Sequence, residues 1–218
     1  MDEEIKKNIM KTGTTTVGIK FKNGVVIGAD RRATFNGMFI AHKNMTKVLP
    51  ITDNIIVATA GNVSDIQFLV KLIKAELRLK KLKTKKESTL KEAANLLASI
   101  AYNNIRRLST IIAITSFLVA GRDRNGFWLY DVQPDGSTSE YTDFVSSGSG
   151  MVVAYGVLED SYDENITKEK AIDLAVKALS AAMKRDIPTG SGIDVYVIDS
   201  KGVEKAVAEK VKEVRVKD

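Results

Sequence analysis

Two residue types that often carry catalysis are scarce: the 218-residue chain has no cysteine and one histidine, His42. The lack of cysteine excludes disulfides, thiolate zinc sites and a cysteine nucleophile. One histidine excludes a multi-histidine metal site, and a Ser-His-Asp hydrolase would have to use His42 as its base. We interpret His42 as a structural residue, and we expect no metal ion and no cofactor in the chemistry.

Features that divide or anchor a chain are also scarce. The sequence has 3 prolines, no Gly/Ser linker and no internal repeat, and 44% of its residues are hydrophobic, which suits one compact domain. No apolar run approaches the roughly 18 residues of a membrane span. Residues 1–13 mix acidic and basic side chains with scattered apolar ones, unlike a secretory signal. We therefore expect a soluble, cytoplasmic protein with no membrane partner.

The formal net charge of +6 is confined to one stretch. Residues 71–87 hold eight lysines and arginines against two glutamates, so the rest of the chain is neutral. A basic helix end could bind nucleic acid or an acidic partner. Stacking of bases needs interleaved aromatic residues, and this stretch has none. We favour a solvated helix face, expect no nucleic acid as a partner, and leave the role of Lys71 to Lys86 open.

Hairpin signals recur along the chain. Asn23-Gly24 separates two runs rich in β-branched residues, 15–22 and 25–30, and predicts a type I′ turn, which needs positive φ at both central residues. Further turns are predicted at 125–126, 134–136 and 200–202. Other strands are expected at 55–59, 111–121, 127–132, 144–147, 193–199 and 203–206.

Helical spacing appears in two pairs of segments. A first helix is predicted by Ile66, Val70, Ile73 and Leu77. A capping box, Thr89 with Glu92, begins a second helix, whose apolar stripe runs through Leu90, Ala93, Leu97, Ala101, Ile105 and Leu108. Helices are also expected over 151–158 and 167–184, the latter with Ile172, Ala175, Leu179 and Met183 facing the core. Hairpins alternating with helix pairs predict a layered α+β sandwich in which helices cover sheet faces.

The most informative segment opens the first strand: Gly13-Thr14-Thr15-Thr16. Three threonines suit a strand, but the glycine before them does not belong to that pattern. Short motifs follow in order at 29–34 (Ala-Asp-Arg-Arg-Ala-Thr), 42–47, 59–61, 148–150, 155–159, 184–186 and 189–190. This ordered set resembles the proteasome β subunits, most closely the archaeal type, from Gly13 to about Val197.

The resemblance implies an N-terminal-nucleophile hydrolase fold, a four-layer αββα sandwich of two antiparallel sheets between helical layers. It implies a threonine endopeptidase that hydrolyses unfolded polypeptides inside four stacked seven-membered rings. The implied partners are α subunits, other β subunits and an ATPase unfoldase. It also implies that residues 1–13 are a propeptide removed by self-cleavage between Gly13 and Thr14, which leaves a single domain over 14–218.

Self-cleavage makes chemical sense for this composition. A threonine hydroxyl is a weak nucleophile that needs a base within hydrogen-bond reach. A free α-amine has a pKa of about 7.7–8.0, close to the best value for a base at neutral pH. Cleavage after Gly13 would create that amine on Thr14 itself, whereas the uncleaved amide cannot accept a proton. Glycine before the cut has no Cβ to obstruct a strained turn.

The resemblance also assigns roles to residues of this sequence. Lys47 would lie beside the Thr14 hydroxyl and pair with Asp30, and the Gly61 N–H would donate to the oxyanion. Around the threonine amine the implied polar residues are Ser149, Asp186 and Thr189, the last in place of the family's usual serine. The Thr34 backbone would pair with substrate. The specificity pocket, which suggests cleavage after apolar side chains, would consist of Ala33, Met45, Leu49, Thr59, Val63 and Gln67.

Alternatives remain open. A β subunit that is never processed could serve as a ring component beside an active paralogue. A bacterial two-ring relative, a basic nucleic-acid module and an amidohydrolase are weaker hypotheses. The family's Pro-Tyr after the second helix is absent from 106–111, which bears on ring contacts. Glu159, Asp160, Asp163 and Glu164 lack the spacing of a calcium loop, and Gly148-Ser149-Gly150 lacks the lysine of a P-loop. The number of β-subunit kinds per ring, and whether processing needs a partner, are not determined.

Overall fold

The computed structural model describes residues 13–35, 37–108 and 114–210. Two five-stranded antiparallel sheets form its centre. The first sheet, in spatial order, contains β10 (Phe144–Gly148), β1 (Thr15–Phe21), β2 (Gly24–Asp30), β11 (Gly192–Asp199) and β12 (Gly202–Lys210). The second contains β5 (Val48–Thr52), β6 (Ile55–Gly61), β7 (Thr115–Asp123), β8 (Gly126–Val132) and β9 (Thr138–Tyr141). A separate hairpin is made by β3 (Ala33–Phe35) and β4 (Phe39–His42).

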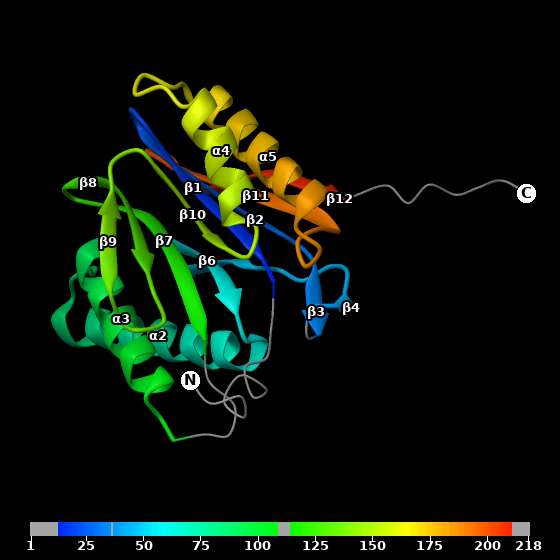
Figure 1. Ribbon diagram of the computed structural model, residues 1–218. Coiled ribbons are helices and arrows are strands. Elements are labelled where there is room, and N and C mark those ends of the chain that lie inside the picture. The colour runs from blue at the N-terminus through cyan, green and yellow to red at the C-terminus, as the bar shows by residue number, and fades with distance from the viewer. Residues whose placement is uncertain (1–12, 36, 109–113, 211–218) are drawn as a thin grey trace, which may run out of the picture.

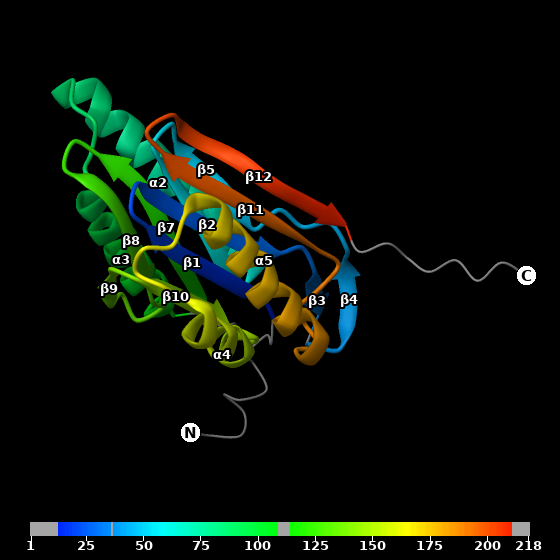
Figure 2. The ribbon, with the colours of Figure 1, turned by 90° about the horizontal axis from the view of Figure 1, so that it is seen from above.

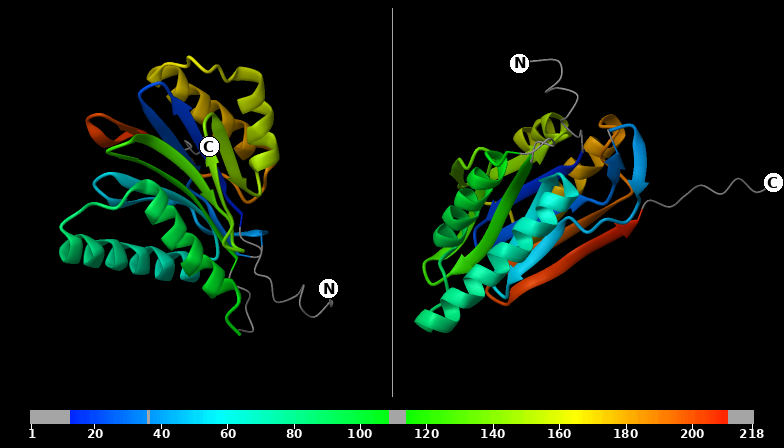
Figure 3. Two further views of the ribbon diagram at one scale, coloured as in Figure 1. Left: turned by 90° about the vertical axis from the view of Figure 1, so that its left-hand side faces the viewer. Right: turned by 90° about the horizontal axis from the view of Figure 1, so that it is seen from below.

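Helix pairs cover the outer faces of the two sheets (Figures 1 and 3). The helices α4 (Met151–Ser161) and α5 (Lys168–Arg185) lie over the first sheet, as Figure 2 shows from above. The helices α2 (Val63–Thr84) and α3 (Leu90–Ile105) lie under the second. The predicted four-layer αββα sandwich, an α+β fold, is confirmed.

Three apolar clusters fill the spaces between the four layers. The period-two alternation of a strand divides β2 between two of them. Val25, Ile27 and Ala29 face the cluster between the sheets, while Val26 faces α4 and α5. Because β2 is buried on both faces, its apolar run is nearly continuous instead of alternating with polar residues.

The basic stretch lies on the solvent side of α2. The apolar side chains of α2, Ile66, Val70, Ile73 and Leu77, are buried against the second sheet, as predicted. Of the basic residues between 71 and 86, all are exposed except the half-buried Lys80. This is the arrangement of a solvated helix face. Within the described residues, no helix is long and apolar enough to cross a membrane.

The second predicted helix is correct at its start and too long at its end. In the capping box of α3, Thr89 Oγ1 accepts from the Glu92 N–H at 3.2 Å, and Glu92 Oε2 accepts from the Thr89 N–H at 2.9 Å. The helix ends at Ile105, and Leu108 is 101% exposed. The prediction that Leu108 continues the buried stripe is therefore wrong, because it lies beyond the helix end and no longer shares its face. The predicted start of the following strand at Ile111 lies outside the described residues.

The helix and hairpin predictions elsewhere are mostly confirmed. In α5, Ala175 and Leu179 are buried, while Ile172 and Met183 pack at the edges of the same cluster. The three predicted hairpins β1–β2, β7–β8 and β11–β12 all form.

The type I′ turn predicted at Asn23-Gly24 is wrong. Phe21 pairs with Gly24, so the loop residues are Lys22 and Asn23, and neither Asn23 nor Gly24 has a positive φ. A glycine is needed at position 24 for a steric reason instead, because a Cβ on Gly24 would lie 2.3 Å from the Ile198 carbonyl oxygen.

Candidate active site

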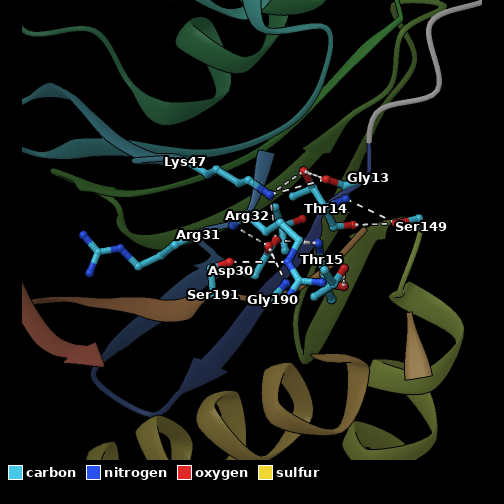
Figure 4. A network of polar contacts seen from close by, with 12 residues as sticks. Gly13, Thr14, Thr15, Asp30, Arg31, Arg32, Lys47, Ser149, Gly190 and Ser191 are labelled. Carbon is cyan, nitrogen blue, oxygen red and sulfur yellow. Dashed lines mark hydrogen bonds and ion pairs between the residues drawn. The ribbon is translucent and has the colours of Figure 1, made fainter. Parts of the chain in front are cut away.

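Thr14 lies directly before β1, which is paired between β10 and β2 in the first sheet, and is only 5% exposed. Its hydroxyl oxygen Oγ1 accepts a hydrogen bond from Lys47 Nζ at 2.8 Å and donates to the Gly13 carbonyl oxygen at 2.7 Å. Lys47 Nζ lies 3.4 Å from the same carbonyl oxygen. The hydroxyl and a cation thus converge on the peptide bond between Gly13 and Thr14 (Figure 4).

Asp30 holds Lys47 in place. Their side chains, 0% and 7% exposed, form an ion pair at 2.8 Å. The register of the β1–β2 hairpin, in which Thr16 pairs with Ala29, returns the end of β2 to the start of β1. Asp30 therefore also accepts from the Thr15 N–H at 3.1 Å. It accepts from two further backbone N–H groups, those of Arg32 and Gly190, at 2.9 Å each. Both oxygens of this buried carboxylate therefore have hydrogen-bond partners, as buried polar groups in proteins usually do.

The burial of Lys47 also affects its acidity. Burial lowers the pKa of Lys47 below its usual 10.5, and the neighbouring Asp30 carboxylate opposes part of that effect. A lysine with a lowered pKa gives up its proton more readily than a surface lysine. The Lys47 Nζ can accordingly act both as a positive charge and as a proton donor to Thr14 Oγ1.

A second group of polar side chains lies on the nitrogen side of Thr14. The Thr14 N–H donates to Ser149 Oγ at 3.2 Å, and the Ser149 hydroxyl donates to Asp186 Oδ2 at 2.6 Å. Thr189 Oγ1 donates to the same carboxylate oxygen and lies 2.8 Å from Thr15 Oγ1. We call Ser149, Asp186, Thr189 and Thr15 the amine-side network. Sequence reasoning missed Thr15, although it stands next to the predicted nucleophile.

A cleft of about 250 Å³ opens beside Thr14. All the residues expected for substrate binding and specificity line it, together with the predicted oxyanion residue Gly61: Ala33, Thr34, Met45, Leu49, Thr59, Val63 and Gln67. Sequence reasoning missed Arg32, Thr46 and Ile66, which also line it. The lining side chains are mostly small or apolar apart from Arg32, Lys47 and Gln67.

Gly61 shapes one wall of this cleft at the end of β6. Its φ of +127° is one that residues with a side chain rarely adopt, and a Cβ there would lie 2.1 Å from the Ile114 carbonyl oxygen. Only glycine fits this position. The backbone of Gly61 consequently borders the cleft without a side chain between it and Thr14.

Other candidate features lie away from this cleft. A larger hollow of about 840 Å³ lies between the α2–α3 connection and the β7–β8 hairpin, and several of its polar groups already have partners, as Lys80 has Glu92 at 3.0 Å. His42 is exposed and accepts from the Asn44 N–H at 3.0 Å through Nδ1, in agreement with a structural role. Within the described ranges, no three His, Cys, Asp or Glu side chains cluster as a metal site.

Comparison with known proteins agrees with the resemblance. Residues 10–198 match the family model described as proteasome subunit. The chain is similar to a proteasome subunit beta of Ferroglobus placidus, 40% identical over 202 residues that cover 93% of this chain and 94% of the relative. It is 42% identical to the subunit beta of Methanocorpusculum labreanum over 202 residues, 93% of each chain. The subunit beta of Methanobrevibacter smithii matches over 217 residues at 38% identity, along the full length of both chains.

Proposed function

The chain belongs to the proteasome subunit family, and from that premise we propose that it is a threonine endopeptidase subunit of a 20S core particle. Thr14 Oγ1 is the proposed nucleophile. The observation that carries this proposal is the buried row of Asp30, Lys47 and Thr14, joined by two contacts of 2.8 Å. A row of this kind activates a hydroxyl and stabilises the charge that develops on it.

The first reaction of this site is cleavage of its own chain. Thr14 Oγ1 attacks the Gly13 carbonyl carbon, the new C–O bond forms, and the C–N bond to Thr14 breaks as the proton given up by Oγ1 passes to the nitrogen. The product is an ester, which water hydrolyses to a Gly13 carboxylate and a free Thr14 hydroxyl. Lys47 Nζ, 2.8 Å from the attacking oxygen and 3.4 Å from the carbonyl oxygen, supports this step because it favours negative charge on either atom.

Loss of residues 1–13 then gives the site its base. The new α-amine of Thr14, with an ordinary pKa of about 7.7–8.0, takes the proton of Oγ1 as that oxygen attacks a substrate carbonyl. The peptide bond breaks to leave an ester on Thr14 and a free amine on the departing fragment, and water then releases the acid. Ser149 Oγ, 3.2 Å from the Thr14 nitrogen, orients this amine.

We propose that an extended polypeptide substrate lies along this cleft. We assign substrate pairing to the Thr34 backbone, oxyanion binding to the Gly61 N–H, and a preference for apolar side chains to the pocket around Met45, Leu49 and Val63. As proposed partners we name α subunits and other β subunits in four stacked seven-membered rings, fed by an ATPase unfoldase. We place this assembly in the cytoplasm.

The first test is the intact mass and N-terminal sequence of the protein, alone and after mixing with a cognate α subunit. The proposal predicts a chain that begins at Thr14 and hydrolyses peptides. Thr14→Ala should keep all 218 residues and lose peptidase activity. A matched control is Thr16→Ala, which should still be processed: Thr16 is buried in β1, two residues from Thr14, and its hydroxyl donates to the Ser147 carbonyl. A fully assembled chain that still begins near Met1 would contradict the proposal.

A further inference from the structure

Gly13, on the amino side of the proposed cut, lies in a space closed by one residue. A Cβ built on Gly13 would lie 1.7 Å from Pro188 Cβ and 2.5 Å from Pro188 Cγ. Carbon atoms in contact sit about 3.5–4.0 Å apart, so no side chain fits unless one partner moves. Ser149 Oγ, at 3.0 Å from the same point, narrows the space further.

Pro188 has little freedom to move away from a side chain at position 13. Its ring fixes its own φ, and the loop around it is tied on both sides. The Thr189 N–H donates to the Asp186 carbonyl at 3.1 Å, Arg32 Nη1 donates to the Ile187 carbonyl at 2.7 Å, and the Gly190 N–H donates to Asp30 at 2.9 Å. The last of these contacts connects the loop to the carboxylate that holds Lys47. A shift of Pro188 would therefore disturb the catalytic row as well.

Residue 13 is equally restricted. Its carbonyl oxygen contacts Thr14 Oγ1 at 2.7 Å and Lys47 Nζ at 3.4 Å. A side chain that pushed residue 13 away from Pro188 would pull this carbonyl from the hydroxyl and the cation together. Either adjustment removes the geometry that self-cleavage requires.

From these contacts we propose that Pro188 is a specificity-determining residue for self-cleavage: its Cβ admits only glycine before Thr14. The inference rests on the proposed self-cleavage and adds the structural reason why the bond is cut after glycine and after no larger residue. Pro188 acts on residue 13 by exclusion and takes no part in the bond changes. Its effect ends once residues 1–13 have left.

The test measures how much Gly13→Ala slows self-cleavage in three proteins, which carry Pro188, Pro188→Gly or Pro188→Ala. We call this slowing the penalty of Gly13→Ala. Cleavage after residue 13 is followed by intact mass in the full chain mixed with its α subunit. With Pro188, the substitution should slow cleavage by about 100-fold or more, the usual cost of a reacting group misplaced by about 1 Å. With Pro188→Gly, which removes the obstructing Cβ, the penalty should fall by about tenfold or more, as expected for two residues in contact. Pro188→Ala keeps the Cβ and should rescue little.

The outcomes separate this inference from the proposed function. If the natural chain is cleaved but the Gly13→Ala penalty is the same with Pro188 and Pro188→Gly, the inference is wrong and the function stands. Rapid cleavage of Gly13→Ala with Pro188 in place would also show that the inference is wrong and leave the proposed function standing. If the natural chain is never cleaved, both are wrong.

A second measurement does not depend on the folding of Pro188→Gly. Structures of the assembled, uncleaved Thr14→Ala and Gly13→Ala/Thr14→Ala proteins can be compared directly. Residue 13 or the loop around Pro188 should differ by about 1.5 Å or more between them, because the carbons must separate to contact distance. Unchanged positions of both would overturn the inference.

Discussion

The two sides of Thr14 differ in burial and in charge. On the hydroxyl side lie Asp30 and Lys47, both buried, which form a direct ion pair. On the nitrogen side lie the exposed Ser149 and the half-buried Asp186, connected through hydroxyl groups. One residue thus presents its two reactive atoms to two environments, a buried one that holds an ion pair and one built mainly from hydroxyls that reaches the surface at Ser149.

This difference indicates a division of labour. In a dry environment an ion pair interacts strongly, and removal of one partner leaves the other charge buried and unpaired. Near the surface, water can replace a lost hydroxyl at little cost. Substitutions on the charged side should therefore be severe, and those on the nitrogen side graded.

The largest effect is expected for Lys47→Ala. It removes the charge beside Thr14 Oγ1 and leaves Asp30 buried without its cation, so self-cleavage and peptide hydrolysis should both fall by about 10²–10³-fold or more. The free energy of unfolding should fall by about 3–5 kcal/mol. N-terminal sequencing, a peptidase assay and a denaturant titration measure the three effects. Lys22→Ala, in the exposed β1–β2 loop, is the control, and retention of more than about a tenth of the activity by Lys47→Ala would contradict the comparison.

A smaller effect is expected for Asp186→Asn. Charge-assisted hydrogen bonds contribute about 1.5–3 kcal/mol, so loss of the charge should lower kcat/KM by about tenfold at neutral pH. The negative charge of Asp186 raises the pKa of Lys47, against the larger lowering by burial. Activity that requires protonated Lys47 is lost as pH rises through its pKa. The basic limb of the pH profile should therefore lie at lower pH in Asp186→Asn.

The control for that profile is Asp173→Asn, an exposed carboxylate on α5. It should leave the basic limb where it is in the natural protein. A basic limb that moves to higher pH in Asp186→Asn would show that another group, not Lys47, titrates there.

The smallest effect is expected at Thr15 and Thr189, two members of the amine-side network that do not contact the Thr14 nitrogen. Thr15→Val keeps the shape of the side chain but removes a neutral hydrogen bond to Thr189 Oγ1, which is worth about 0.5–1.5 kcal/mol, or about 2- to 10-fold in kcat/KM. Thr189→Ser keeps the hydroxyl and should stay within about twofold of the natural protein. If Thr15→Val proved as damaging as Lys47→Ala, the two sides of Thr14 would not differ as described.

Part of the site could be anticipated from local physics. A hairpin between 15–22 and 25–30 necessarily returns its end to its beginning, so Asp30 had to lie near Thr14 and Thr15. The observed contact from the Thr15 N–H to Asp30 follows from that register. The capping box at Thr89 likewise depends only on neighbouring residues, and it formed as predicted.

The rest depends on contacts between distant segments. Lys47 reaches Thr14 only because β3 and β4, which we did not predict, turn the chain back into β5. These strands are short, and no residue of β4 is buried, so they carry little hydrophobic periodicity. The role of Lys47 came from the resemblance, not from the pattern. The contact of Pro188 with Gly13 joins residues 175 positions apart and has no local signal. At Asn23-Gly24, close approach to Ile198 outweighed the usual turn preference.

The most direct test of the central role of Thr14 is to map where an electrophilic peptide attaches. The assembled protein is treated with the reagent, digested and analysed by mass spectrometry. We predict that the added mass lies on Thr14 at the start of a chain without residues 1–13, and that Lys47→Ala loses the adduct. Attachment to any other residue, or to a chain that still carries Gly13, would contradict the account.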